Sequence, residues 1–265
     1  MGGDSIAVLD YRLGRLTVLD PSGDLARIVL LQETSGRVIQ LRSIYDSAFV
    51  SLGFSLESIP NEPGSYRVPY QILYLSPSGR IIDTVAVIRG FEGYQNAAGS
   101  ASIPFGKDGH IATRGQDLII GTSDMLGFER YDETLTHVQS VRAPRFELQL
   151  SPQEIDSTRQ SMFVDGLPPE IMDLLEGVEI PASKPAYSKL LIDQGGFVWA
   201  AEYYARGGPE GAVDWNVFAP NGEWLGSVET PARFNVFEVG PDYLLGVKRD
   251  EMGVEHVQIL RLRRS

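Results

Sequence analysis

The sequence predicts an all-β fold assembled from successive β-hairpins, and three observations support this prediction. First, a four-residue turn recurs as Asp20-Pro21-Ser22-Gly23, Ser76-Pro77-Ser78-Gly79 and Ala219-Pro220-Asn221-Gly222. Proline presets φ at the second turn position, and glycine tolerates the left-handed conformation at the exit. Second, the segments beside these turns alternate apolar and polar residues, as half-buried strands do. Third, the whole strand pattern recurs every ~40–50 residues.

The predicted strands fall into five units. The first unit, residues 6–31, has three strands, and the second has four: Arg37–Tyr45, Ala48–Leu56, Arg67–Leu75 and Ile81–Ile88. In the third unit, residues 102–143, we expect Lys107-Asp108-Gly109 to join the first two strands. The fourth unit, residues 187–230, has Asp193-Gln194-Gly195 as its first turn, and the fifth, residues 233–262, has three strands.

Four-stranded antiparallel units that recur at this spacing indicate the blades of a β-propeller. We expect a single propeller domain over residues 1–265, whose ring has five blades or needs a sixth. The first unit lacks its innermost strand and the last its outermost. A propeller closes when one terminus completes the blade begun by the other, so an incomplete ring would leave edges that favour a dimer.

One segment, residues 145–186, interrupts the β pattern as a helical and extended insertion between blades. Ser151 is a cap residue, Pro152 suits the first helical position, and Glu154 completes a capping box. We expect a helix from there to about Phe163, with Ile155, Met162 and Phe163 as its apolar stripe. A second helix, Pro169–Glu176, should end at Gly177 as its C-cap.

The composition excludes several classes of protein. The chain of 265 residues has a net charge of −12, which argues against nucleic acid as a partner, because phosphate binding needs clustered Lys and Arg. It has no cysteine, and so neither a disulfide nor a thiolate site. No apolar run approaches the ~18 residues of a transmembrane helix, and the N-terminus does not have the pattern of a signal peptide.

The lengths of the connections predict a functional face. Within a unit, the first and third connections are tight and lie on one face of a propeller, whereas the second connections and the links between blades lie on the other. The long connections there are Glu57–Tyr66, Arg89–Ala101, Pro144–Tyr187 and Ala205–Ala212. Binding residues concentrate on long loops of a rigid scaffold, so we expect the ligand site on this face. The alternative is that the helices only cap the ring.

Two groups of residues are candidates for binding. Paired tyrosines beside a glycine-rich loop suit a recognition surface, although they could instead pack between blades. Inner strands line a propeller's channel, where charged residues could meet a ligand or point at a neighbouring blade. The two groups give the candidate set Glu202, Tyr203, Tyr204 and Arg206, together with Arg42, Lys189 and Glu238.

The sequence gives few signals for metal binding or catalysis. Acids that end strands, among them Asp10, Asp124 and Asp250, could hold a cation, but turn and salt-bridge roles are favoured. We expect Trp199, Trp215 and Trp224 in the core between blades. The three histidines, His110, His137 and His256, have no Ser or acid at motif spacing, and Gly-x-Ser-x-Gly is absent. No catalytic residue, metal site or cofactor is nominated.

The hairpin from Asp10 through Arg15-Leu16-Thr17-Val18-Leu19-Asp20 to Gly23 resembles the repeat of NHL-type and TolB-like propellers. Ile192-Asp193-Gln194-Gly195-Gly196-Phe197-Val198-Trp199 is similar to the inner hairpin of that superfamily, and the stretch from Pro185 to Glu255 resembles uncharacterised bacterial six-bladed propellers. The resemblance implies six blades and no established catalytic residues.

The functional expectation is therefore a non-enzymatic module that binds a protein or a small molecule, in the periplasm or secreted, with the cytoplasm left open. The alternative is a hydrolase similar to the metal-dependent lactonase propellers. Those hold a divalent cation with Glu, Asn and Asp, and here only Asn235 and Glu238 share an inner strand.

Overall fold

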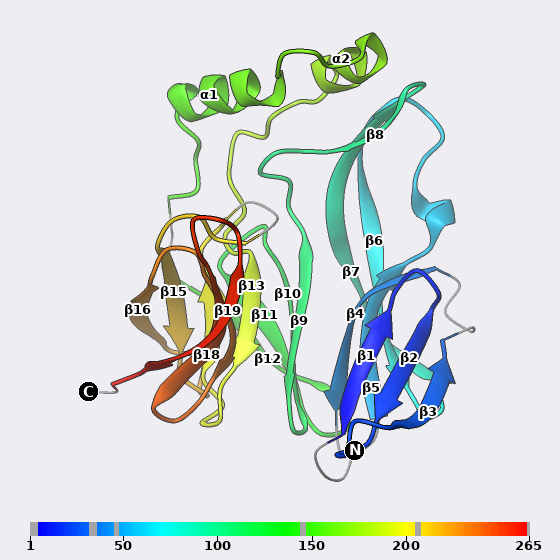
Figure 1. The fold of residues 1–265 in the computed structure, drawn as a ribbon, viewed down its shortest axis with the longest axis vertical. Coiled ribbons are helices and arrows are strands. Elements are labelled where there is room, and N and C mark those ends of the chain that lie inside the picture. Colours follow the sequence, from blue (N-terminus) through cyan, green and yellow to red (C-terminus); the bar gives the residue numbers. More distant parts are fainter. Residues whose placement is uncertain (1–4, 32–35, 45–47, 144–146, 205–207, 264–265) are drawn as a thin grey trace. The chain divides into compact units, whose positions relative to one another are not determined.

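The structure is a computed structural model that describes residues 5–31, 36–44, 48–143, 147–204 and 208–263. Its strands form five antiparallel sheets, and in every sheet each strand pairs with its neighbours in the chain (Figure 1). This meander order is that of a propeller blade, and the chain has a β-propeller fold. It divides into two compact units: unit 1 is Met1–Gly109 with Leu148–Lys184, and unit 2 is His110–Glu147 with Pro185–Ser265.

Unit 1 contains a three-stranded and a five-stranded sheet. The first is β1 (Ile6–Asp10), β2 (Arg15–Leu19) and β3 (Leu25–Leu30). The second is β4 (Arg37–Ile44), β5 (Ala48–Phe54), β6 (Gly64–Leu75), β7 (Ile81–Asn96) and β8 (Gly99–Ser102), with a 3-10 helix η1 (Leu56–Ser58) before β6. The sheets pack face to face through a core that includes Leu16, Val29, Phe49 and Leu75.

Unit 2 contains three sheets. They are β9 (Gly109–Arg114), β10 (Asp117–Thr122), β11 (Gly127–Tyr131) and β12 (His137–Arg142); β13 (Lys189–Ile192), β14 (Val198–Ala201), β15 (Val213–Phe218) and β16 (Trp224–Thr230); and β17 (Phe234–Val239), β18 (Tyr243–Arg249) and β19 (Glu255–Arg261). The five groups of strands predicted from the sequence are therefore confirmed as five sheets. The three-strand count is confirmed for the first and last of them.

Four of the hairpin turns share one feature, a strand-end aspartate that accepts two backbone amides from the turn. Asp20 Oδ1 accepts the amides of Ser22 and Asp24 at 2.9 and 3.0 Å. Asp132, Asp193 and Asp250 do the same two and four residues ahead. Each aspartate thereby mimics backbone hydrogen bonding and fixes the length of its turn.

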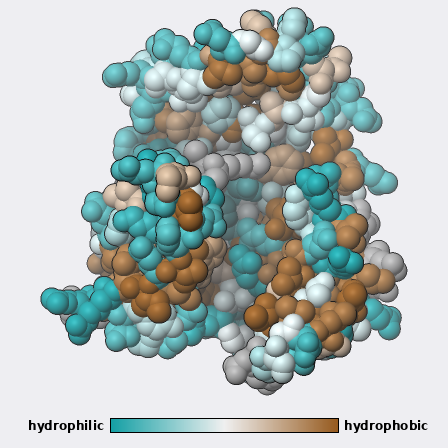
Figure 2. Space-filling model, in the orientation of Figure 1, coloured by the Kyte–Doolittle hydropathy of each residue, from teal (hydrophilic) through white to brown (hydrophobic). Residues whose placement is uncertain are grey.

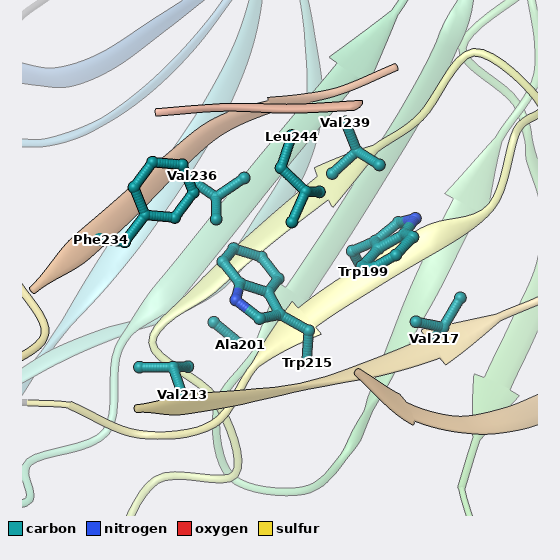
Figure 3. Packing of buried hydrophobic residues seen from close by; sticks show 9 residues of the cluster. All are labelled: Trp199, Ala201, Val213, Trp215, Val217, Phe234, Val236, Val239 and Leu244. Carbon is teal, nitrogen blue, oxygen red and sulfur yellow. The ribbon is translucent and has the colours of Figure 1, made fainter. Parts of the chain in front are cut away.

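The core between sheets β13–β16 and β17–β19 is shown in Figure 3, where Trp199 and Trp215 lie against Phe234, Val236 and Leu244. Each indole is anchored, because Trp199 Nε1 donates to Asp193 Oδ2 at 3.0 Å and Trp215 Nε1 to Thr230 Oγ1 at 3.2 Å. The prediction for these two residues is confirmed. It is wrong for Trp224, which lies on the outer strand β16 and is 39% exposed.

Both predicted helices are present in unit 1, α1 (Pro152–Met162) and α2 (Pro169–Glu176). The capping box of Ser151 and Glu154 forms, and Ile155, Met162 and Phe163 are half-buried. Gly177 ends α2 in the right-handed region, so no left-handed cap requires a glycine there. A Cβ at this position would instead collide with the hydroxyl of Tyr94.

The predicted long loop Arg89–Ala101 is wrong. Strand β7 runs on to Asn96 and returns through β8. Two glycines of β7 are covered by aromatic rings on β6: a Cβ at Gly90 would strike the ring of Tyr70, and one at Gly93 the ring of Tyr66. Glycine in a strand often marks such a close approach.

The turn predicted at Lys107-Asp108-Gly109 is also wrong. Lys107 and Asp108 precede β9 and Gly109 begins it, and the turn to β10 is formed around Gly115, which has a φ of 58°. Lys107 is buried, its amide donates to Glu92 Oε2 at 2.8 Å, and its Nζ donates to the carbonyl of Ser183. Within the described ranges, no helix has the length and apolarity needed to cross a membrane.

Replacing Asp193 by alanine should lower the free energy of unfolding by roughly 2–4 kcal/mol, because two turn amides and a buried indole lose their acceptor. Asp20→Ala is the matched control; it removes the same turn bonds at a solvent-exposed site, with an expected cost of about 1 kcal/mol. Urea denaturation followed by tryptophan fluorescence measures both. Equal losses for the two variants would contradict the anchoring role of Asp193.

Candidate functional site

A cavity of about 200 Å³ lies at the connection between β14 and β15 in unit 2. It is at the end of the sheet opposite the tight turns at Asp193–Gly196 and Ala219–Gly222. Its lining residues are Glu202, Tyr203, Tyr204, Pro209, Gly211, Ala212, Val213 and Asp214. Three of the predicted binding residues therefore line one cavity, while Arg206 lies outside the described residues.

The backbone of this connection is held at both ends. The amide of Glu202 donates to the carbonyl of Asp214 at 2.8 Å, which extends the pairing of β14 with β15 by one step. Ser188 clamps the next turn: its Oγ accepts the amide of Tyr204 at 2.7 Å and donates to the carbonyl of the same residue at 3.2 Å. Glu202 and Tyr204 are thus fixed by the sheet that carries them.

The two tyrosines have different surroundings. Tyr204 packs against the Trp199–Trp215 core, and burial raises the pKa of its phenol, so the packing interpretation is correct for this residue. Tyr203 is half-buried and lines the cavity without belonging to that core. One ring is therefore a fixed wall, and the other is a candidate for contact with a ligand.

Carboxylates dominate the charge of the cavity lining. Glu202 is exposed, Asp214 is half-buried, and the described lining includes no lysine or arginine. The adjacent Glu210 is paired with Arg233 at 3.3 Å and lines a second cavity of about 40 Å³ beside β17–β19. The described lining of the larger cavity therefore combines two carboxylates with the ring of Tyr203 and that of Tyr204.

Lys189 and Glu238 occupy the neighbouring inner strands but do not line the larger cavity. Lys189 Nζ donates to Asn235 Oδ1 at 3.2 Å and to the carbonyl of Val236, and lies 4.6 Å from the centre of the Phe237 ring. Glu238 accepts the hydroxyl of Tyr243 at 2.7 Å, which raises the pKa of that phenol. Lys189 therefore ties β13 to β17, and its role in binding stays a prediction.

Arg42 belongs to β4 in unit 1, where it is exposed and donates to the carbonyl of Leu41 at 3.2 Å. Asn235 and Glu238, the two candidates for a lactonase-like ligand set, are engaged by Lys189 and Tyr243 as described. No group of three or more His, Asp or Glu side chains in the described part of the chain could hold a metal ion. At the strand ends, Asp10 and Asp250 accept turn amides, which favours their structural interpretation.

Sequence reasoning missed a polar cluster on β11 and β12. Glu129 Oε2 lies 2.7 Å from His137 Nε2 and accepts the hydroxyl of Ser140, while Oε1 accepts Arg142. Ser140 lies directly opposite Glu129, and a bulge next to Tyr131 brings His137 onto the same face of the sheet. A second histidine also has an acid partner, since His256 Nε2 lies 3.1 Å from Asp250 Oδ2. Both partners lie across a hairpin, where motif spacing cannot find them.

This cluster does not have the order of a nucleophilic triad. In a triad the serine and the acid bind different ring nitrogens of the histidine. Here both Ser140 and Glu129 approach Nε2 of His137, at 3.2 and 2.7 Å. The cluster is therefore an ion-pair network, and hydrogen-bond donors surround its carboxylate.

Comparison with known proteins assigns no function to the cavity. No family model and no curated protein match the chain. A member of the DUF4221 family from Bacteroides vulgatus aligns with 97% of this chain and 75% of its own, at 12% identity and a TM-score of 0.48. The calcium-binding protein regucalcin from Agrobacterium tumefaciens aligns over 91% of this chain and 64% of its own length, at 14% identity and a TM-score of 0.38.

A third structure, virginiamycin B lyase from Staphylococcus aureus with quinupristin, aligns over 97% of this chain and 81% of its own, at 10% identity and a TM-score of 0.40. At such identities and scores, no ligand or activity transfers from these proteins to this chain. The assignment of the fold rests on the topology of the sheets.

The Glu129 network should make stability pH-dependent. Although burial opposes ionisation, hydrogen bonds from Ser140, Arg142 and His137 lower the pKa of Glu129 below its ordinary value. A carboxylate with a lowered pKa stabilises the fold fully above its unfolded pKa, about 4.3, and loses that contribution as the pH falls below it. We expect the free energy of unfolding to fall between about pH 5 and pH 3, and Glu129→Gln to make this fall shallower. Urea titrations of both proteins across that range measure it; parallel curves would contradict the role of Glu129.

Proposed function

We propose that the protein is a non-enzymatic binding module and that the Glu202–Asp214 cavity is its ligand site. The ligand class is a small cation, an amine or guanidinium group on a short apolar stem. The observation on which this rests is a lining that combines two carboxylates with tyrosine rings at the loop end of a rigid sheet.

The chemistry of the lining supports a cationic ligand. A carboxylate accepts charge-assisted hydrogen bonds from guanidinium or ammonium groups, which are stronger than neutral ones. The face of a tyrosine ring attracts the same cations. Glu202 and Tyr203 come from adjacent positions, and Asp214 comes from the facing strand, so the three approach one cavity from two sides.

The dimensions of the cavity favour a small group. Drug-sized ligands occupy pockets of roughly 300–1,000 Å³, whereas this cavity measures about 200 Å³. A single lysine or arginine side chain, free or as part of a peptide, fits this range better than a nucleotide or an oligosaccharide.

The number of blades and the cellular location of the protein are also proposals. A six-bladed ring is proposed from the resemblance of the Pro185–Glu255 stretch to six-bladed propellers. A location outside the cytoplasm is proposed from the family resemblance alone.

The experiment compares N-acetyl-arginine methylamide with its neutral isostere N-acetyl-citrulline methylamide by isothermal titration calorimetry. We expect the arginine compound to bind and Glu202→Gln or Asp214→Asn to raise its Kd about tenfold, equivalent to about 1.4 kcal/mol for one lost charge-assisted bond. The Kd of the citrulline compound for the unchanged protein should be at least as high as the Kd of the arginine compound for either variant.

Glu223→Gln is the matched control, because Glu223 lies in the β15–β16 turn at the opposite end of the same sheet and carries the same charge. It should leave the Kd unchanged. Binding of both compounds with equal affinity, or an equal effect of Glu223→Gln, would contradict a cation site at this cavity.

A further inference from the structure

Strand β19 is the outer edge of its sheet. The sheet order is β17-β18-β19, and among the described residues no strand pairs with the far side of β19. An edge strand presents a row of backbone N–H and C=O groups that can pair with another chain. Proteins commonly protect such edges, so an open one calls for a partner or a device that prevents pairing.

The backbone groups that face outward can be identified from the register. The amide of Leu262 donates to the carbonyl of Asp242 on the β18 side, and the pairs Leu260–Leu244 and Gln258–Gly246 follow in the same phase. In an antiparallel pair the hydrogen-bonded positions alternate. The N–H and C=O groups of residues 255, 257, 259 and 261 therefore point away from β18.

The same odd-numbered positions carry the apolar face of the sheet. Val257 is 76% exposed and Ile259 is 69% exposed, and Phe237, raised by a bulge in β17, is 54% exposed. Figure 2 shows apolar surface over β18 and β19. Glu255 and Arg261, at the two ends of the strand, are exposed and opposite in charge.

We propose that a second copy of this chain pairs with β19 through its own β19, antiparallel and about a two-fold axis at Gln258. In this register Glu255 of each copy lies opposite Arg261 of the other, and Val257 lies opposite Ile259. The pairs 255–261 and 257–259 are the outward-facing hydrogen-bonding positions, so the backbone phase, the charges and the apolar side chains agree on one alignment. The product is a continuous six-stranded sheet.

Other alignments lose at least one of these matches. Shifting the axis to Val257 or Ile259 keeps the backbone phase but separates the opposite charges. A parallel alignment in register would place Glu255 opposite Glu255 and Arg261 opposite Arg261, and like charges directly opposite are destabilising. The two-fold antiparallel pairing is also isologous and closed, whereas pairing of β19 with β1 of a second copy would be heterologous and would generate larger rings or open filaments.

The test is a charge-swap series measured by sedimentation velocity on the full chain. Glu255→Arg alone and Arg261→Glu alone each place like charges opposite at both ends, and each should raise the dimer Kd at least about tenfold. Because the two variants carry complementary changes, mixing them should restore a dimer that contains one copy of each. The double variant E255R/R261E should also dimerise as the unchanged chain does.

Arg249→Gln is the control, because Arg249 is the intrachain partner of Glu255, at 2.9 Å, and does not face the second copy. It should leave the dimer intact, and circular dichroism should show that every variant is folded. The proposal is overturned if the unchanged chain stays monomeric at a concentration of about 100 μM, where pairing with a Kd near 1 μM would be complete. It is equally overturned if open polymers form, or if the mixture of single variants does not recover the dimer. None of these results depends on whether the Glu202–Asp214 cavity binds a cation.

Discussion

The aspartate that closes four of the hairpins is the interaction on which the registers of their strands depend. One carboxylate oxygen accepts two amides of its turn, and this recurs at Asp20, Asp132, Asp193 and Asp250. A turn of fixed length sets the register of its strands, and a slip by one residue would move every side chain to the opposite face of the sheet. At Asp193 the second oxygen also holds the indole of Trp199, so turn and core specify the same register.

The same constraint explains where a site can form. Tight turns occupy one end of sheet β13–β16, so only the connection between β14 and β15 can lengthen without changing a register. That connection brings acids and aromatic rings together, since Glu202 continues the ladder, Ser188 clamps Tyr204, and Asp214 begins the return. The sheet holds the backbones of Glu202, Tyr204 and Asp214 in place, so the proposed ligand would not have to order these three residues.

The parts that the sequence predicts are those set by neighbouring residues. The Pro-x-Gly and Asp-x-x-Gly turns, the capping box of Ser151 and the five strand groups need only local chemistry, and the structure has them. The errors arise where a distant residue decides. The segment Arg89–Ala101 is predicted as a loop, yet most of it continues a long hairpin in which Tyr70 and Tyr66 cover Gly90 and Gly93. His137 meets Glu129 only because a bulge moves it onto that face, and no spacing rule contains the bulge. Glu202, Tyr203 and Tyr204 could be predicted because they are adjacent; their partner Asp214 could not.

The alternation that builds the core also determines what the last sheet exposes. Even-numbered residues of β19 face the Trp199–Trp215 core side, where Leu260 is half-buried against it, so the odd-numbered apolar residues must face outward. An edge of this kind would aggregate unless something limits its pairing. Glu255 and Arg261 flank the apolar pair, and their opposite signs favour the alignment that brings each opposite the other over alignments that separate them or place like charges together. In the proposed dimer, these two charged side chains would both limit non-specific pairing of an exposed strand and favour a single closed register. Neither side chain takes a position on the buried face of the sheet.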